Sequence, residues 1–209
     1  MIKQLVMATN NANKLREARE ILEGYELLCP ADLGITDELP ETAMTLRENS
    51  LQKAEALYAL CGLDCFADDS GLEVDALGGA PGAHAARFAV DVARRDGLPL
   101  PPDHDFDINI ETLLKELAKH PGEPRTARFR SVVTLILGGR KYFFEGAMEG
   151  RIAMERSGSG GFGYDPVFIA DDFPGCSVAE LPEDVKNSIS HRGKALRAMA
   201  LWLQENQQK

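Results

Sequence analysis

A hairpin pattern in the second half of the chain constrains the fold more than any other feature. Two runs predicted as strands, Ala127–Leu137 and Lys141–Ala147, are joined by the short segment Gly138-Gly139-Arg140. Glycine supplies the left-handed backbone of a tight turn, so these strands should pair antiparallel. The first half of the chain instead alternates predicted strands with predicted helices, at residues 4–8, 14–23, 25–29, 45–60 and 65–68. A chain that combines both patterns is predicted to be an α/β protein with a mixed sheet.

The remaining elements fit the same layout. Thr45 and Glu48 have the spacing of a capping box at the start of the long helix. Asp107 is predicted to cap a helix that stops at Pro121-Gly122. A short strand is expected at residues 167–169, a last helix at 192–204, and loops at 96–106 and 157–163. No internal repeat or linker divides the chain, so residues 1–209 are predicted to form a single domain.

Composition limits the possible partners. The net charge is −10, and an acidic surface repels nucleic-acid polymers, which we do not expect as partners. No apolar stretch is long enough to span a membrane, so we expect no membrane partner and predict a cytoplasmic location. None of the cysteines forms a CxxC motif, and we expect buried free thiols at Cys29, Cys61, Cys65 and Cys176.

Two adjacent acids raise the main chemical question. The apolar run Cys65-Phe66-Ala67, predicted to end a strand, leads into Asp68 and Asp69, and Ser70-Gly71 follows. Adjacent carboxylates repel each other, and at the end of a buried strand they need water, a cation or a donor. One interpretation is a solvated turn, because Asp-Ser-Gly is a favourable turn sequence. The other is a divalent-metal site with a general base, in which strand alternation lets only one of the acids meet the metal directly.

The turn after the first strand is a candidate anion site. Thr9-Asn10-Asn11-Ala12-Asn13-Lys14 precedes a helix, whose first N–H groups favour an anion, and Lys14 adds a full charge. Asparagine tolerates the left-handed backbone, so this residue type can shape a tight loop here. The simpler alternative is a plain helix cap with an exposed lysine.

Glu41 lies just ahead of the long helix, on which Asn49 and Lys53 share a face. This face is either solvated or turned toward a cleft that Glu41 also enters.

Two later segments suggest recognition of a ligand. The glycine-rich stretch Ser157–Asp165 carries Phe162 and Tyr164, which offer flat surfaces for stacking unless the stretch is only a surface loop. The stretch Lys186–Lys194 places several cations, with His191 and Arg192, at the start of the last helix. Cations there oppose the helix dipole, which favours an anionic ligand.

In this order and combination, the motifs resemble the inosine/xanthosine triphosphate pyrophosphatase (ITPase) family. They span nearly the whole chain: TNNANK from Thr9, PET from Pro40, FADDSGLEVDALGGAPG from Phe66, TARF from Thr126, SGGFGYDPVF from Ser159 and KNSISHRGKAL from Lys186. The resemblance implies a Mg²⁺-dependent enzyme that converts ITP, dITP or XTP to the monophosphate and pyrophosphate. It also implies a homodimer and an elongated mixed-sheet α/β fold with two lobes around a central cleft.

The resemblance also implies residue roles. Glu41 and Asp69 would bind the metal, and Asp69 would accept a proton, with Lys53 and Asp68 in support. The nucleotide would be bound by Thr9, Asn10, Asn11, Ala12, Asn13, Lys14, Ser70, Phe162, Gly163, Tyr164, Asp165, Lys186, His191 and Arg192. Two departures stand out, because members often have glycine at the positions of Asn10 and Asn13, and residues 89–107 are longer than the usual spacing.

The implied chemistry agrees with the residue types. A triphosphate carries about four negative charges, which must be neutralised before water attacks phosphorus. Lys14, Lys186 and Lys53 would supply cations, while Asp69, or Asp68 beside it, would take the proton from water attacking the α-phosphorus. Two rivals are a Maf-type pyrophosphatase, whose SxSxxR opening is absent, and a nucleotide-binding sensor, which has no need of a general base.

Overall fold

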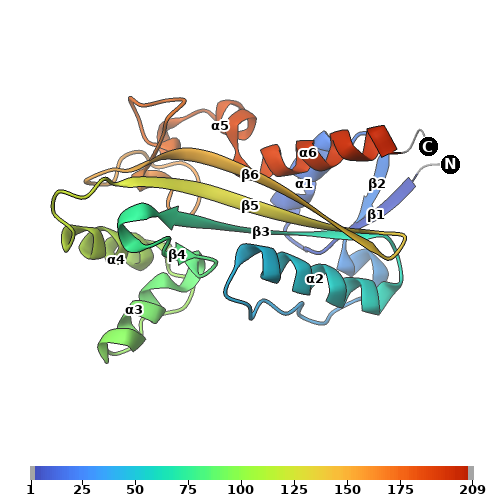
Figure 1. Ribbon diagram of the computed structural model, residues 1–209, viewed down its shortest axis with the longest axis horizontal. Helices are drawn as coiled ribbons and strands as arrows, with labels where there is room; N and C mark the ends of the chain where they lie inside the picture. Colours follow the sequence, from blue (N-terminus) through green and yellow to red (C-terminus); the bar gives the residue numbers. More distant parts are fainter. Residues whose placement is uncertain (1–2, 207–209) are drawn as a thin grey trace. The chain divides into compact units, whose positions relative to one another are not determined.

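The computed structural model describes residues 3–206, and it contains the predicted mixed sheet (Figure 1). The strand order is β2-β1-β3-β5-β6-β7, with β4 paired to β3. β1 (Lys3–Met7) runs parallel to β2 (Tyr25–Leu28) and to β3 (Cys65–Val74). β3 is antiparallel to β4 (Pro81–Gly82), and β6 (Arg140–Ile152) is antiparallel to β7 (Phe168–Ala170). Parallel and antiparallel pairs therefore occur in one sheet, which confirms the predicted α/β class.

The hairpin that motivated this prediction is present. β5 (Thr126–Leu137) and β6 are neighbours in the sheet, and a two-residue turn joins them. Gly138 has a φ of 56° and Gly139 a φ of 75°, a backbone that residues with a side chain rarely adopt. These glycines allow two long strands to reverse direction without an intervening loop.

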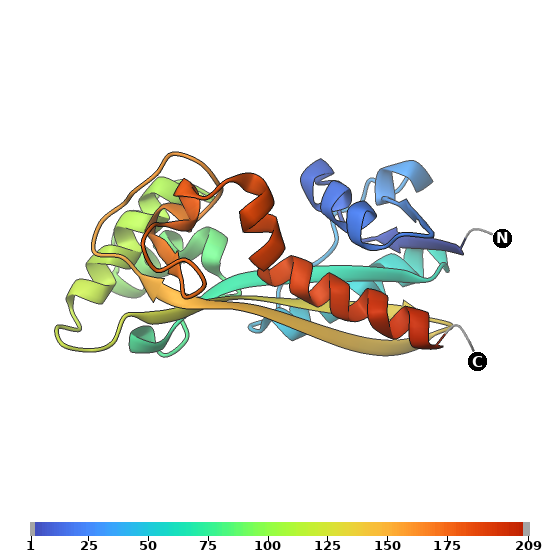
Figure 2. The ribbon, with the colours of Figure 1, turned by 90° about the horizontal axis from the view of Figure 1, so that it is seen from above.

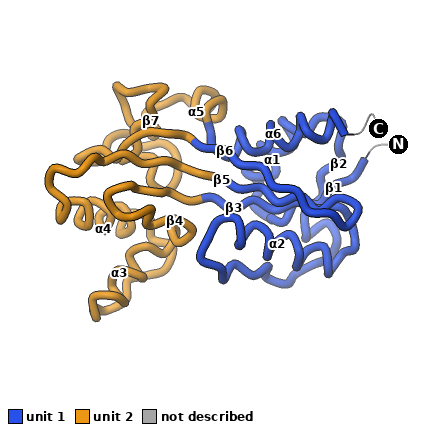
Figure 3. Tube along the Cα trace, in the orientation of Figure 1, with its two compact units in different colours: residues 1–70, 131–147, 190–209 blue, residues 71–130, 148–189 orange. Residues whose placement is uncertain are grey.

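The chain packs as two compact units (Figure 3). Unit 1 takes in the described residues up to Ser70, then Ser131–Ala147, and the described residues from Ser190 onward. Unit 2 comprises Gly71–Arg130 and Met148–Ile189. The expectation of one domain with two lobes stays a prediction.

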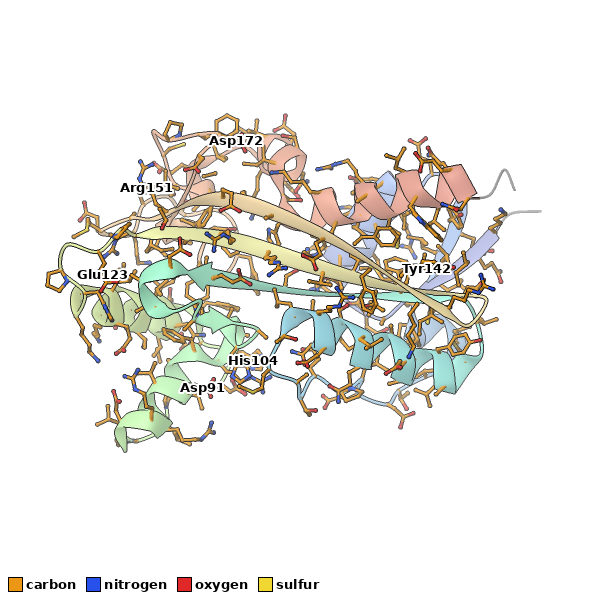
Figure 4. All side chains as sticks on the ribbon, in the orientation of Figure 1. Asp91, His104, Glu123, Tyr142, Arg151 and Asp172 are labelled. Carbon is orange, nitrogen blue, oxygen red and sulfur yellow. The ribbon has the colours of Figure 1, made fainter. Side chains whose placement is uncertain are left out.

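Unit 1 buries both faces of its part of the sheet. α1 (Ala12–Ile21) and α6 (His191–Asn206) cover one face, and α2 (Leu46–Cys61) covers the other (Figures 1 and 2). Leu5, Phe66 and Leu135 face α1 and α6 with other apolar residues, whereas Val6 and Ala67 face α2. Tyr142 of β6, labelled in Figure 4, packs on Trp202 of α6, and their ring centroids are 4.3 Å apart. Strand alternation thus places successive residues in different cores.

Unit 2 has its own core. α3 (Phe88–Asp96), α4 (Phe106–Ala118) and α5 (Glu183–Ile189) are its helices. Leu72, Ile110, Leu113 and Phe168 are buried together in this core, with further apolar residues of β6, β7 and the loops. Short 3₁₀ turns complete the described chain at Pro30–Leu33, Asp75–Leu77, Ala85–Arg87, Asp165–Val167 and Val178–Glu180.

Several predicted boundaries were wrong. α1 begins two residues early because the Asn11 side chain caps it, accepting from the N–H groups of Asn13 and Lys14. The cap of α4 is Asp105, which accepts from the Ile108 N–H, and not Asp107. The sequence pattern also missed α5, a helix of 7 residues, which is too short for a recognisable apolar period.

Other features bear on earlier expectations. All four cysteines are free thiols, of which Cys29 and Cys65 are buried and Cys61 and Cys176 are half-buried. Burial raises the pKa of the Cys65 thiol to about 12. None of the helices within residues 3–206 has the length and apolar character needed to cross a bilayer.

Candidate active site

The two adjacent acids lie inside β3 rather than at its end. The strand continues to Val74, because Leu72 and Glu73 pair with Gly82 and Pro81 of β4. The prediction of a strand ending at the acids, and the alternative of a solvated turn, are both wrong, since strand pairing outweighs the local turn preference of Asp-Ser-Gly. Asp68 and Asp69 are only 2% and 8% exposed, so each carboxylate must be stabilised by groups around it.

Asp68 forms ion pairs with two cationic side chains. Its Oδ2 lies 2.9 Å from Lys14 Nζ and 3.0 Å from Arg192 Nε. Burial alone would raise the pKa of Asp68, but Lys14, Arg192 and also Lys53 together hold it well below its usual range. Arg192 is further fixed by Glu17, whose Oε2 lies 3.2 Å from Nη1. Asp68 is therefore an ionised counter-ion shared by two side chains near neutral pH.

Asp69 faces different surroundings. Its Oδ1 lies 3.4 Å from Lys53 Nζ, and its buried Oδ2 has no hydrogen-bond partner among the described residues. Burial, together with the negative charges of Glu41 and Asp68, raises the pKa of Asp69, although Lys53 and Asn49 act in the opposite direction. A buried carboxylate oxygen without a partner has unused capacity for a cation or a proton.

Glu41 is linked to Asp69 through Lys53. The Lys53 ammonium donates to Glu41 Oε1 at 2.5 Å. Burial alone would lower the pKa of Lys53, but the charges of Asp68, Asp69 and Glu41 raise it instead. Asn49 and Lys53 are 1% and 5% exposed, so the solvated-face interpretation of this side of the helix is wrong.

The segment that carries Glu41 is held against α2 by polar contacts at three successive residues, Glu41, Thr42 and Ala43. Besides the Lys53–Glu41 pair, Gln52 Oε1 accepts from the Thr42 N–H at 2.9 Å, and Asn49 Oδ1 accepts from the Ala43 N–H at 2.8 Å. Helical spacing places these three side chains on one side of α2. The contacts of Gln52 and Glu17 could not be predicted from the sequence, because an exposed and a buried polar residue look alike in a helical pattern.

The turn from Thr9 to Lys14 is shaped by side-chain hydrogen bonds. Thr9 Oγ1 accepts from the Asn11 N–H at 3.2 Å, and Asn10 Oδ1 accepts from the Ala31 N–H at 3.2 Å. Among residues 3–206, the non-glycine residue with a positive φ is His104. The expected left-handed asparagines are therefore not found, and the asparagine side chains shape the turn instead.

The cations near the last helix are met by carboxylates of the chain itself. Arg192 contacts Asp68 and Glu17, as described above, and Lys186 of α5 forms an ion pair with Asp165. His191 is the first residue of α6. Ser190 Oγ donates to Glu17 Oε1 at 2.9 Å and accepts from the Gly193 N–H at 2.9 Å. Carboxylates of the chain therefore neutralise these cations, so their position near the start of the helix does not by itself require a bound anion.

The glycine-rich stretch Ser157–Asp165, called the aromatic loop below, lies in unit 2, and its two aromatic residues differ in exposure. Phe162 is 74% exposed, whereas Tyr164 is buried and donates its hydroxyl to the Ala85 carbonyl at 2.7 Å. Burial raises the pKa of Tyr164. Buried Asp165 accepts from the Phe162 N–H at 2.7 Å. Gly161 has a φ of 81°, and a Cβ there would overlap Asp165 Oδ2, so a side chain at this position would not fit the observed backbone.

The two predicted metal ligands suit an ion that is completed by its substrate. Within residues 3–206, no three His, Cys, Asp or Glu side chains converge as a metal site. Mg²⁺, however, is often held by one or two carboxylates, with phosphate oxygens and water as its other ligands. Glu41 and Asp69 fit that pattern, since Asp69 Oδ2 has no hydrogen-bond partner within residues 3–206. Ser70, the residue after Asp69 in β3, donates to Ser131 Oγ at 3.0 Å.

Comparisons with known proteins agree over nearly the whole chain. The family model described as the Ham1 family matches residues 5–202. A dITP/XTP pyrophosphatase of Porphyromonas gingivalis is 47% identical over 97% of this chain and 98% of its own, and one of Bacillus subtilis is 41% identical over 98% of both. The solved Ham1 protein of Staphylococcus aureus superposes with a TM-score of 0.85 at 32% identity, covering 98% of this chain and 100% of its own.

Proposed function

The chain belongs to the Ham1 family, and on that premise we propose that it is a nucleoside triphosphate pyrophosphatase acting on non-standard purine nucleotides. The resemblance to the ITPase family is confirmed by these relatives, which are dITP/XTP pyrophosphatases. The proposed substrates are ITP, dITP and XTP, and the products are the monophosphate and pyrophosphate. Such an enzyme removes these nucleotides from the pool used for synthesis.

The observation that carries this proposal is the unequal environment of the two acids. Asp68 is held ionised by Lys14 and Arg192, whereas Asp69 has a raised pKa and a buried oxygen that lacks a hydrogen-bond partner in the described part of the chain. A general base works best when its pKa lies nearer the working pH than that of an ordinary aspartate. The geometry therefore supports Asp69, and not Asp68, as the proton acceptor.

The proposed cofactor is Mg²⁺, held by Glu41 and Asp69. When bound, the ion neutralises phosphate charge and favours departure of pyrophosphate. Lys53 contacts both carboxylates, since its Nζ lies 2.5 Å from Glu41 Oε1 and 3.4 Å from Asp69 Oδ1. We propose that Lys53 neutralises the acids in the free protein and would add its charge to the binding of the triphosphate. Two cations cannot both sit against the same pair of carboxylates without repulsion.

The triphosphate is proposed to bind the Thr9–Lys14 turn and Lys186, and Ser70 is proposed to contact the nucleotide. The exposed Phe162 ring stacks on the base, and Gly163, Tyr164 and Asp165 hold the loop that presents it. Arg192, with His191, is proposed to donate to the 6-keto oxygen of hypoxanthine or xanthine. Adenine carries a donor at that position, so it would leave both donors unpaired.

A pyrophosphate-release assay over purine and pyrimidine triphosphates, with and without Mg²⁺, tests the activity. We expect ITP, dITP and XTP to be preferred over ATP, GTP and the pyrimidines, and activity to vanish in EDTA. A preference for pyrimidine triphosphates would indicate the Maf type of enzyme. Binding of ITP without turnover would indicate a nucleotide sensor.

The site of bond cleavage needs a separate measurement. Hydrolysis in ¹⁸O-labelled water should place the label in the nucleoside monophosphate, since water attacks the α-phosphorus in this proposal. Label in free orthophosphate, with contaminating pyrophosphatase excluded, would contradict it.

We also propose a homodimer in the cytoplasm. The dimer rests on the family relationship, and the location rests on the substrates, which belong to the cellular nucleotide pool. Light scattering at micromolar concentration should give about twice the chain mass of 22.8 kDa. A mass equal to one chain would contradict the dimer.

A further inference from the structure

The exposed Phe162 side chain is held on one side by a second aromatic residue. The ring centroids of Phe162 and Phe106 lie 4.6 Å apart at an interplanar angle of 63°, an edge-type contact. Phe106 also makes an edge contact with buried Tyr164 at 6.2 Å. A Cβ at Gly163 would lie 3.3 Å from Phe106, so the backbone of the loop passes close to the same ring. Phe106 thus makes ring contacts with Phe162 and Tyr164 and lies close to the backbone of Gly163 between them.

Phe106 is itself rigidly placed. It is the first residue of α4, whose N-cap Asp105 accepts from the Ile108 N–H at 3.1 Å. Asn109, one turn on, donates to the Ala86 carbonyl at 2.9 Å and accepts from the Ala89 N–H at 2.7 Å. These bonds fix the start of α4 against the segment that leads into α3. The Phe106 ring therefore rests on a fixed helix end and not on a loose loop.

The position of Phe106 in the sequence is informative. It lies within residues 89–107, which the resemblance to the ITPase family suggests are longer than the usual spacing. The connection from α3, which ends at Asp96, leads to the capped start of α4, and Phe106 at that start contacts the aromatic loop.

We propose that Phe106 is a positioning residue for the base-stacking ring of Phe162. This inference rests on the proposed function and assigns Phe106 no contact with the reacting atoms. An exposed phenylalanine on a glycine-rich loop has several rotamers, and a base that stacks on it must select one of them. The backbone of Phe162 is fixed by its bond to Asp165, and Phe106 fixes the ring. Phe106 therefore favours purine binding by removing part of this ordering cost.

The proposal predicts a specific kinetic pattern for Phe106→Ala. Aromatic pairs contribute enough to change an equilibrium constant by roughly two- to tenfold, so KM for ITP should rise by about that factor. The kcat value should stay within about twofold, because Phe106 touches none of the proposed catalytic groups. The inhibition constant of inorganic pyrophosphate, which has no base, should not change. Phe106→Tyr keeps the ring and should retain the wild-type KM.

A double-mutant cycle with Phe162→Ala identifies the route of the effect. If Phe106 acts through the Phe162 ring, Phe106→Ala should add nothing to the KM of the Phe162→Ala variant. The matched control is Phe129→Ala, which removes another tilted ring pair of unit 2, Phe129–Phe168, with the same 4.6 Å centroid distance. It should leave KM for ITP unchanged even if it lowers the melting temperature.

The outcomes separate this inference from the proposed function. An unchanged KM in Phe106→Ala, an equal rise in the pyrophosphate inhibition constant, or a full additional effect in the Phe162→Ala background would overturn the positioning role. Should Phe106→Ala fold poorly, Phe106→Leu keeps the apolar volume without the ring and should show the same rise in KM. A wild-type protein that releases no pyrophosphate from ITP contradicts the proposed function itself.

Discussion

Substituting each of the two adjacent acids by asparagine should give opposite results. Asp68→Asn removes the shared counter-ion of Lys14 and Arg192, whose contacts at 2.9 and 3.0 Å reach a carboxylate that is only 1% exposed. Breaking a buried ion pair from one side costs about 3–5 kcal/mol. Lys14 and Arg192 keep 24% and 23% of their side chains exposed, and water can partly solvate them, so we expect the lower end, about 3 kcal/mol.

Asp69→Asn should leave the free energy of unfolding unchanged or increase it. Because the folded-state pKa of Asp69 is raised, folding disfavours its ionised form, and a neutral amide of nearly the same shape removes that cost. Turnover should fall by roughly 10²–10⁴-fold from loss of a general base, with loss of a metal ligand adding to this. Asp68→Asn is thus expected to lower stability, whereas Asp69→Asn is expected to lower activity without lowering stability.

Urea unfolding at pH 7 and pyrophosphate release from ITP measure the two effects on the same preparations. Equal losses of stability in the two variants would refute the assignment of different environments. An Asp69→Asn variant that retains half of the wild-type kcat would remove Asp69 from the mechanism. Asp68→Asn is informative for stability only, because displaced Lys14 and Arg192 would also disturb nucleotide binding.

Three further predictions use the same structure. The folded-state pKa of Asp68 is depressed, so ionised Asp68 stabilises the folded protein above the unfolded pKa of about 4. This stabilisation is lost as pH falls toward the folded pKa. The difference in unfolding free energy between wild type and Asp68→Asn should therefore shrink in urea titrations below about pH 4. Asn49→Leu removes the acceptor for the Ala43 N–H, and it should raise the Mg²⁺ concentration needed for half-maximal activity by roughly tenfold, as loss of groups that orient metal ligands does. Gly161→Ala combines a φ of 81° with an overlap on Asp165 and should lower stability by at least about 1 kcal/mol, whereas Gly175→Ala, with no atom within 4 Å, should leave the urea midpoint unchanged.

The base-reading role of Arg192 gives a last kinetic prediction. Arg192→Ala should reduce kcat/KM for ITP more than for ATP, and an unchanged ITP/ATP ratio would place base recognition elsewhere. Since Arg192 also neutralises Asp68, both substrates should lose some activity. Only the ratio reports on the base.

The sequence predicted the sheet class and most elements because their signals are local. The Gly138-Gly139 turn, the capped α2 and the alternating strands and helices each depend on a few neighbouring residues. The wrong boundaries have two kinds of cause. The starts of α1 and α4 depend on which of several nearby polar side chains caps the helix, whereas β3 continues through Asp-Ser-Gly because Leu72 and Glu73 pair with β4 in the sheet.

The structure brings together four residues that the sequence singled out, Asp68, Asp69, Glu41 and Lys53, while their roles stay predictions. Helix spacing could not show that Lys53 is buried between Glu41 and Asp69. Glu17 was missed for the same reason, since its role depends on Arg192 and Ser190 at the other end of the chain. Burial of a polar side chain is a property of the tertiary structure, which a single sequence does not contain.

The placement of both acids within a strand explains how two adjacent carboxylates come to have different environments. In a loop, neighbouring carboxylates would share the same solvent and have similar pKa values. In β3, successive side chains point to opposite faces, so Asp68 meets the cations of α1 and α6 while Asp69 meets Lys53 of α2. Lys14 and Arg192 hold one acid ionised, and burial raises the pKa of the other. The helices on the two faces of the sheet therefore set the chemistry of each acid, and exchanging the cations of one face should alter one acid more than the other.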